Sequence, residues 1–146
     1  MKTTVKLVAL MMFVVILLPS CKKYEEGPTI SLRSKKARVV NIWKVDKVYI
    51  NAVDVTANYA LAHKDFALEF KDDGTLVQTY TDANSLPQSV TGTWALGSKN
   101  ETLDLTYLGI TLSHTILKLK NDELWLKIAF TTGGVTTTNE YHYITK

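Results

Sequence analysis

The chain has 146 residues, of which 46% are hydrophobic and 21% are charged, and it contains a single cysteine. This length suits one domain with one core, and a single cysteine excludes an internal disulfide. The formal net charge of +3 gives no electrostatic reason to expect nucleic acid as a partner.

The first 20 residues have the pattern of an export signal. Lys2 and Lys6 give a positively charged start, and an unbroken apolar run of 12 residues covers 7–18. A run of that length fits the apolar region of a signal peptide and is short for a transmembrane helix. Without residues 1–20 the chain has 15 basic and 14 acidic side chains, so the remaining protein is almost neutral.

The end of this segment resembles the lipobox of bacterial lipoproteins. Leu18 lies three residues before Cys21, and the small residue Ser20 directly precedes it. The resemblance implies that the chain is cleaved before Cys21 and that this cysteine is lipidated, so that acyl chains anchor the protein in a membrane. Lys22 replaces the aspartate that commonly retains such proteins in the inner membrane, which favours the outer membrane, on its periplasmic or its cell-surface side. An ordinary secretory signal with a chance cysteine is the alternative.

Three regions are therefore expected. Residues 1–20 are a signal peptide that is removed, and residues 21–38 are the lipidated cysteine and a flexible tether, because they lack sustained periodicity and contain Gly27-Pro28. Residues 39–146 are a single folded domain.

Residues 39–146 alternate apolar and polar side chains at the spacing of β-strands. The first strand, 39–50, needs a bulge near Asp46, because the apolar residues before and after that point lie on opposite faces. Residues 57–63 fit either a short helix or a loop that covers one end of the sheet. Further strands are expected at 66–70, 76–81, 90–96, 103–107, 112–120, 124–130 and 135–145.

Short turns separate most of these strands, including Asp72-Asp73-Gly74-Thr75 and Gly133-Gly134. About eight antiparallel strands in a meander leave two open edges, and closure into a barrel removes them. The expected fold is therefore all-β, a single antiparallel up-and-down barrel. In the later strands, Leu117 and Leu119 are expected to share one face of their strand, and Trp125 is expected to face outward.

Several short motifs resemble the lipocalin-like β-barrel domains of bacterial envelope lipoproteins. They are Trp43 in the first strand, residues 68–75 (Leu-Glu-Phe-Lys-Asp-Asp-Gly-Thr), Gly92-Thr93-Trp94, and the hairpin 117–126. The resemblance covers about residues 39–146 and implies an up-and-down barrel of mostly uncharacterised function.

No arrangement of residues indicates catalysis, so the protein is not expected to be an enzyme. Ser113 and His114 are neighbours on a strand and point to opposite faces, which prevents a nucleophile–base pair. His63, His114 and His142 lack the spacing of metal ligands, and neither a metal nor a cofactor is expected. His142 shares a face with Glu140, and we expect a surface contact there.

The interior of the barrel is the candidate binding site. An eight-stranded barrel is either filled by its own side chains or holds one small ligand. Eight aromatic residues are candidate interior ligand contacts: Trp43, Tyr49, Phe70, Tyr80, Trp94, Tyr107, Phe130 and Tyr141. The leading hypothesis is a non-catalytic, outer-membrane-anchored lipoprotein that binds a small apolar or amphipathic ligand. The alternative is an interaction module with a filled core, whose loops or outer face contact an envelope protein or a glycan.

Overall fold

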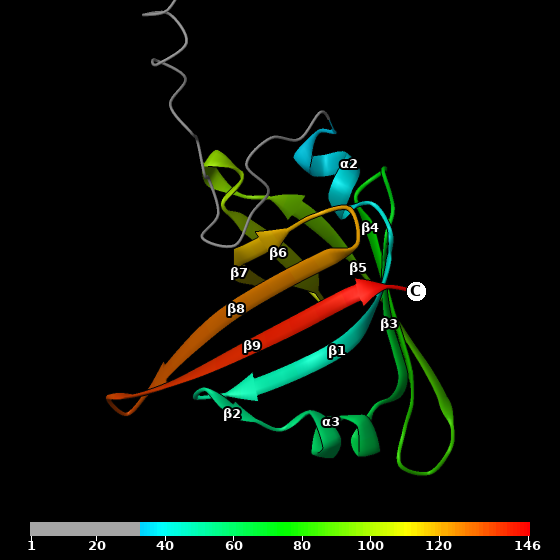
Figure 1. The fold of residues 1–146 in the computed structure, drawn as a ribbon, viewed down its shortest axis with the longest axis vertical. Helices are drawn as coiled ribbons and strands as arrows, with labels where there is room; N and C mark the ends of the chain where they lie inside the picture. The colour runs from blue at the N-terminus through cyan, green and yellow to red at the C-terminus, as the bar shows by residue number, and fades with distance from the viewer. Residues whose placement is uncertain (1–32) are drawn as a thin grey trace, which may run out of the picture.

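The computed structural model describes residues 33–146, and these residues form a closed β-barrel (Figure 1). The strands follow one another around one antiparallel sheet, and pairing of the first long strand with the last closes it. The short strand β2 lies beside β1, and the other eight strands make the up-and-down barrel that the sequence predicts. The strands are β1 (Ile42–Ile50), β2 (Val53–Asp54), β3 (Lys64–Phe70), β4 (Thr75–Thr81), β5 (Pro87–Leu96), β6 (Thr102–Tyr107), β7 (Ile110–Leu119), β8 (Glu123–Thr132) and β9 (Val135–Thr145).

The hairpin turns follow the local sequence. Gly133 and Gly134 join β8 to β9 with φ angles of 58° and 80°, which suits the two-residue turns that match the twist of antiparallel strands. Asp73 accepts a hydrogen bond from the backbone N–H of Thr75 at 2.8 Å in the β3–β4 turn. A short 3-10 turn, η2 (Ser98–Asn100), lies between β5 and β6.

Two of the three register shifts in the described sheet bear on the predicted side-chain directions. The first lies between Val45 and Lys47, as the sequence predicts, and it turns Tyr49 to the outer face, where its ring lies 5.2 Å from that of His142. The second lies between Ile116 and Lys118. It places Ile116 and Leu119 in the core, so the expectation that Leu117 shares the face of Leu119 is wrong.

One end of the barrel is packed solid. Trp43 is fully buried there, and the ring of Phe70 meets that of Trp94 edge-on at 5.6 Å. The Trp94 indole donates to the Lys71 carbonyl oxygen at 2.8 Å. The core also contains Leu68, Leu76, Leu103, Leu105, Leu124 and Leu126.

A short helix, α2 (Lys35–Val39), closes this packed end. Arg38 donates to the Leu119 carbonyl oxygen at 2.6 Å, and the Trp43 indole donates to the Val39 carbonyl oxygen at 2.8 Å. The prediction that the flexible tether continues to residue 38 is therefore wrong for this helix, because the apolar contacts and these buried hydrogen bonds fix it. The predicted signal peptide, Cys21 and tether residues 22–32 lie outside the described residues.

The helix α3 (Thr56–Ala62) covers the opposite end, at the bottom of Figure 1. The sequence of residues 57–63 fits either a short helix or a loop that covers one end of the sheet. The structure has the helix. Within residues 33–146, no helix has both the length and the apolar character needed to cross a bilayer.

Candidate functional site

A cavity of about 150 Å³ lies inside the barrel near the end covered by α3. Leu68 and Leu105 belong both to the packed core and to the wall of this cavity, so the hollow begins where the packed core ends. Leu112 and Phe66 add further apolar wall. The barrel therefore has one filled end and one hollow end.

Aromatic rings gather at the hollow end. Tyr59, on α3, lines the cavity, and its ring stacks on His63 at 4.4 Å. It also meets Phe66 edge-on at 5.7 Å and Tyr141 edge-on at 6.1 Å. His63 in turn lies 5.2 Å from the ring of Tyr80. These contacts hold α3 against the strand ends and make it the cover of the cavity.

The cavity wall is polar in part but uncharged. None of its lining residues is Lys, Arg, Asp or Glu. Burial raises the pKa of Tyr107 to about 12 and also raises the pKa of Tyr59 and Tyr143, so these phenols stay protonated at physiological pH. The polar side chains of the wall are Tyr59, Gln78, Tyr107, His114, Tyr141 and Tyr143.

His114 is the buried histidine of this wall. Only 7% of its surface is exposed, and burial lowers its pKa below the ordinary value. Its Nδ1 lies 3.1 Å from the Leu112 carbonyl oxygen. A neutral imidazole keeps the cavity free of charge, and an uncharged wall suits an uncharged ligand.

The hydroxyl of Tyr107 is buried and has no hydrogen-bond partner among the described residues. Its ring lies over Gly92 of the neighbouring strand. A Cβ at Gly92 would collide with the Thr106 carbonyl oxygen and come 2.8 Å from Cδ1 of Tyr107. Gly92 therefore leaves the space that the Tyr107 ring needs to reach the cavity wall.

The eight predicted interior aromatics occupy five different places. Tyr107 and Tyr141 line the cavity. Trp43, Phe70 and Trp94 fill the packed end, and Tyr80 lies beside His63 at the hollow end. For Tyr49 and Phe130 the interior placement is wrong. Tyr49 lies on the outer face beside His142, and Phe130 is 42% exposed on the part of β8 that pairs with β9 but no longer with β7.

Other cavity residues were missed, although some left a signal in the sequence. Tyr143 lies two residues from Tyr141, and His114 alternates with Leu112 and Ile116, so strand periodicity places both inward. The contribution of Tyr59 had no such signal, because the direction in which α3 packs depends on the strands beneath it.

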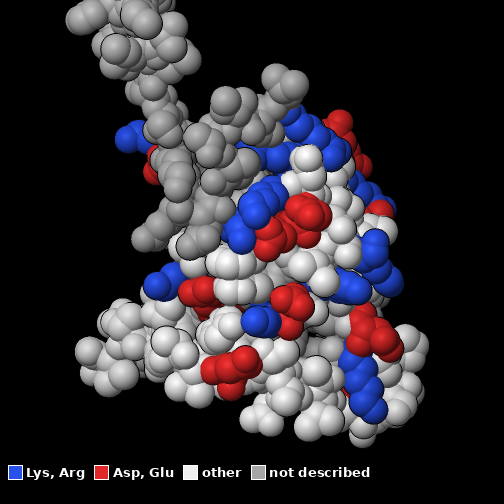
Figure 2. Space-filling view, in the orientation of Figure 1, with Lys and Arg blue, Asp and Glu red and all other residues white. Residues whose placement is uncertain are grey.

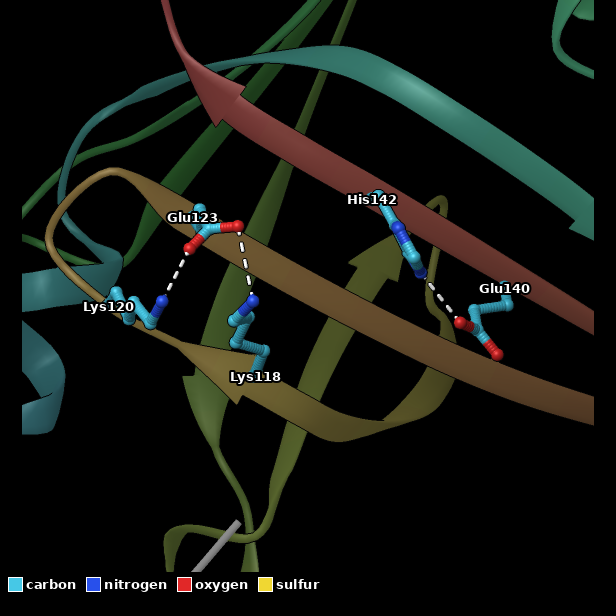
Figure 3. A network of polar contacts seen from close by, with 5 residues as sticks. All are labelled: Lys118, Lys120, Glu123, Glu140 and His142. Carbon is cyan, nitrogen blue, oxygen red and sulfur yellow. Dashed lines mark hydrogen bonds and ion pairs between the residues drawn. The ribbon is translucent and has the colours of Figure 1, made fainter. Parts of the chain in front are cut away.

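The outer wall carries a separate polar network (Figure 3). Glu123 accepts hydrogen bonds from Lys118 at 3.2 Å and from Lys120 at 2.8 Å. His142 Nε2 lies 2.6 Å from a carboxylate oxygen of Glu140, which is the contact expected from their shared face. The His142 ring also stacks on Trp125 at 3.9 Å, and Lys118 lies 3.8 Å above Trp125. Both faces of the Trp125 ring are therefore covered.

The arrangement of polar residues matches no catalytic pair. Ser113 donates to Asp104 at 2.6 Å on the exposed side of β7, whereas His114 points into the barrel, so the two do face opposite ways. Within residues 33–146, no three histidine, cysteine, aspartate or glutamate side chains are grouped so that they could hold a metal ion.

The fold is that of a lipocalin-like barrel. The structure is similar to a lipocalin-like protein from Bacteroides uniformis, with a TM-score of 0.56 and 8% identity over 75% of this chain and 99% of that chain. It is also similar to lobster apocrustacyanin A1, with a TM-score of 0.56 and 14% identity over 73% of this chain. The match spans 60% of the crustacyanin chain. An uncharacterised protein from Bacteroides eggerthii matches with a TM-score of 0.50, at 9% identity over 73% of this chain and 98% of that chain.

No protein-family model matches the sequence. No curated protein matches it either. At these low identities the structural similarities define the fold.

Proposed function

We propose that the barrel binds a small, uncharged, amphipathic molecule in the cavity beneath α3. The observation that carries the proposal is the buried Tyr107 hydroxyl, which has no partner among the described residues and belongs to an uncharged wall of mixed polar and apolar side chains. A buried polar group without a hydrogen bond costs about 1–3 kcal/mol. A ligand with a hydrogen-bonding group recovers part of that cost.

The size of the cavity limits the ligand. Pockets for drug-sized ligands usually measure about 300–1,000 Å³, and this cavity measures about 150 Å³. A space of about 150 Å³ is large enough for a molecule the size of benzene. We therefore expect one ring or a short chain with one or two polar groups, and a larger ligand requires α3 to move.

Titration with p-cresol tests this proposal, because p-cresol is uncharged, has one ring and carries one hydroxyl. We expect saturable binding that shifts the NMR signals of the cavity residues. Tyr107→Phe should weaken binding by about 2- to 10-fold, which corresponds to one ordinary hydrogen bond. The same change should leave stability equal or higher, because it removes an unsatisfied buried hydroxyl.

Tyr49→Phe is the matched control, because Tyr49 lies on the outer face. It should leave p-cresol binding unchanged. Loss of binding in both variants, or no binding to the natural protein at millimolar p-cresol, would show that the barrel interior is not a binding site. Native mass spectrometry of the protein from its own cells then identifies a bound molecule directly.

We further propose that the protein is an outer-membrane lipoprotein anchored through Cys21. The support is the order of a charged start, an apolar run and the Leu-Pro-Ser-Cys sequence at 18–21. Replacement of Cys21 by alanine should release the mature protein from the membrane fraction. A Cys21→Ala protein that stays in that fraction, cleaved as before, would contradict acyl anchoring.

An interaction module remains the second candidate, in which an envelope protein or a glycan contacts the loops. Among residues 33–146, eight of the nine exposed large hydrophobic residues lie toward the α3-covered end: Ile50, Val53, Leu61, Leu86, Leu108, Ile110, Phe130 and Val135. Apolar residues gathered at loop tips often mark interaction surfaces. A failed p-cresol titration together with capture of an envelope component that Leu108→Asn weakens would favour this reading.

A further inference from the structure

The hairpin of β8 and β9 extends beyond the barrel wall, at the lower left of Figure 1. The pairing of β8 with β7 ends at Lys127, opposite Thr115. The pairing of β8 with β9 continues without a register shift to Thr132 and Val135 at the tip. Residues 128–132 therefore have a strand partner on one side only among the described residues.

The free side of β8 presents backbone hydrogen-bonding groups. In a two-residue hairpin the pair next to the turn, here Thr132 and Val135, exchanges hydrogen bonds, and such pairs then alternate along the ladder. Phe130 and Ile128 consequently bond to β9. Ala129 and Thr131 direct their N–H and C=O groups away from β9, toward the empty side. Two residues with free donors and acceptors on one edge can accept an antiparallel strand.

This edge lacks the features that usually protect an exposed strand. Such edges normally carry lysine, proline or a bulge. Residues 128–139 contain no charged residue and no proline, and Figure 2 shows the projecting hairpin as an uncharged region, in the orientation of Figure 1. Phe130 and Val135 are 42% and 69% exposed. The edge therefore combines free backbone groups with exposed apolar side chains.

The other edge of the hairpin is partly occupied. Asn51 donates its backbone N–H to the Thr138 carbonyl oxygen at 2.8 Å, and its side chain accepts from the Thr138 N–H at 2.9 Å. Near the tip of β9, Thr136 is then the one residue whose backbone N–H and C=O point away from β8 without a strand partner among the described residues. The edge of β8 is consequently the longer free edge.

We propose that two copies of this chain associate through β8, antiparallel and with the two-fold axis at Phe130. In this register Ala129 of each copy exchanges two hydrogen bonds with Thr131 of the other. Phe130 lies opposite Phe130 of the second copy as a non-hydrogen-bonded pair, in which side chains approach most closely. A second copy suits this edge because an uncharged strand meets its own equivalent without like-charge repulsion. The interaction is independent of ligand binding in the cavity.

Disulfide trapping tests the register in the full chain. Non-hydrogen-bonded pairs have a Cα separation of about 4.5 Å, which lies within the disulfide range of about 4.4–6.8 Å. Phe130→Cys should therefore form a covalent dimer under mild oxidation. Val135→Cys is the matched control, since it is exposed on the same hairpin but lies far from the axis, and the natural chain controls for dimers through Cys21. Absence of a Phe130→Cys dimer, or equal dimer in the control, would overturn the proposal.

Two proline variants test the edge by sedimentation of the same full chain in detergent. Thr131→Pro removes an N–H from the β8 edge, and Thr136→Pro removes one from the β9 edge. Both lose the same contact between the Thr131 and Thr136 hydroxyls, which lie 2.9 Å apart. The natural chain should dimerise with rising concentration, Thr131→Pro should weaken that association at least 10-fold, and Thr136→Pro should leave it within 2-fold. A natural chain that stays monomeric at millimolar concentration, or equal effects of the two prolines, would overturn the proposal.

Discussion

The burial of His114 makes the stability of the barrel depend on pH. It faces inward between Leu112 and Ile116, and burial lowers its pKa in the folded protein. In the unfolded chain the imidazole protonates near its ordinary pKa of 6.5. Below about pH 6.5 the unfolded state therefore binds more protons than the folded state, and the free energy of unfolding falls. His114 thus makes the barrel less stable in acid.

We predict that His114→Gln reduces this loss of stability. The measurement is urea unfolding at about pH 7.5 and about pH 5.5, a window that lies above most carboxylate titrations. The difference in unfolding free energy between the two pH values should be smaller in His114→Gln than in the natural protein. His142→Gln is the control, because His142 lies on the outer wall beside Glu140. The His142→Gln variant should still lose the part of its unfolding free energy at low pH that His114 causes. If His142→Gln abolished the whole loss of stability, the effect would not belong to His114.

Among the turns, the β6–β7 hairpin contains a residue poorly suited to its conformation. Leu108 has a φ angle of 51° and is 96% exposed, and Gly109 follows with a φ angle of 80°. A two-residue turn with two positive φ angles favours Asn-Gly. A left-handed conformation costs an ordinary residue about 1–2 kcal/mol. Exposure gives Leu108 no packing that would offset this cost.

We therefore predict that Leu108→Asn raises the free energy of unfolding by about 0.5–1 kcal/mol, measured by urea denaturation. Leu86→Asn is the matched control. Leu86 is also exposed, at 56%, but it is not among the residues with positive φ. An equal gain in both variants would mean that removal of an exposed leucine, rather than relief of backbone strain, stabilises the protein.

The strands were predictable from sequence because alternation and turn residues are local signals. The last strand, 135–145, is observed with the expected bounds. The orientation of side chains was less predictable where a bulge intervenes. Leu117 shows this, since the slip between Ile116 and Lys118 depends on pairing with β8, and nothing within β7 itself reveals it.

At the scale of the whole molecule, the division into a filled and a hollow end explains why the candidate site was predicted only in part. Trp94 and Tyr107 are both inward-facing aromatics, yet Trp94 packs on Phe70 and Tyr107 lines the cavity. The sequence places a residue on a face of its strand. Its height along the barrel depends on the stagger of all the strands, and that stagger is a property of the closed sheet.

The filled end also depends on residues before the first strand. Arg38 is 6% exposed and donates to the Leu119 carbonyl oxygen at 2.6 Å. This hydrogen bond links α2 to the end of β7. Loss of a buried hydrogen bond to a charged donor costs about 1.5–3 kcal/mol. We predict that Arg38→Leu lowers the free energy of unfolding by about that amount.

Lys36→Ala provides the control for this prediction, because it changes the same helix without touching the buried contact. Lys36 pairs with Asp72 at 3.1 Å, but the two side chains are 55% and 82% exposed. Exposed ion pairs contribute about 0–1 kcal/mol, so Lys36→Ala should have a much smaller effect than Arg38→Leu in urea denaturation. Equal effects would mean that α2 lies on the barrel as a surface helix. A large effect confined to Arg38 would make α2 an integral part of the closed end, and the folded domain would then begin before the first strand.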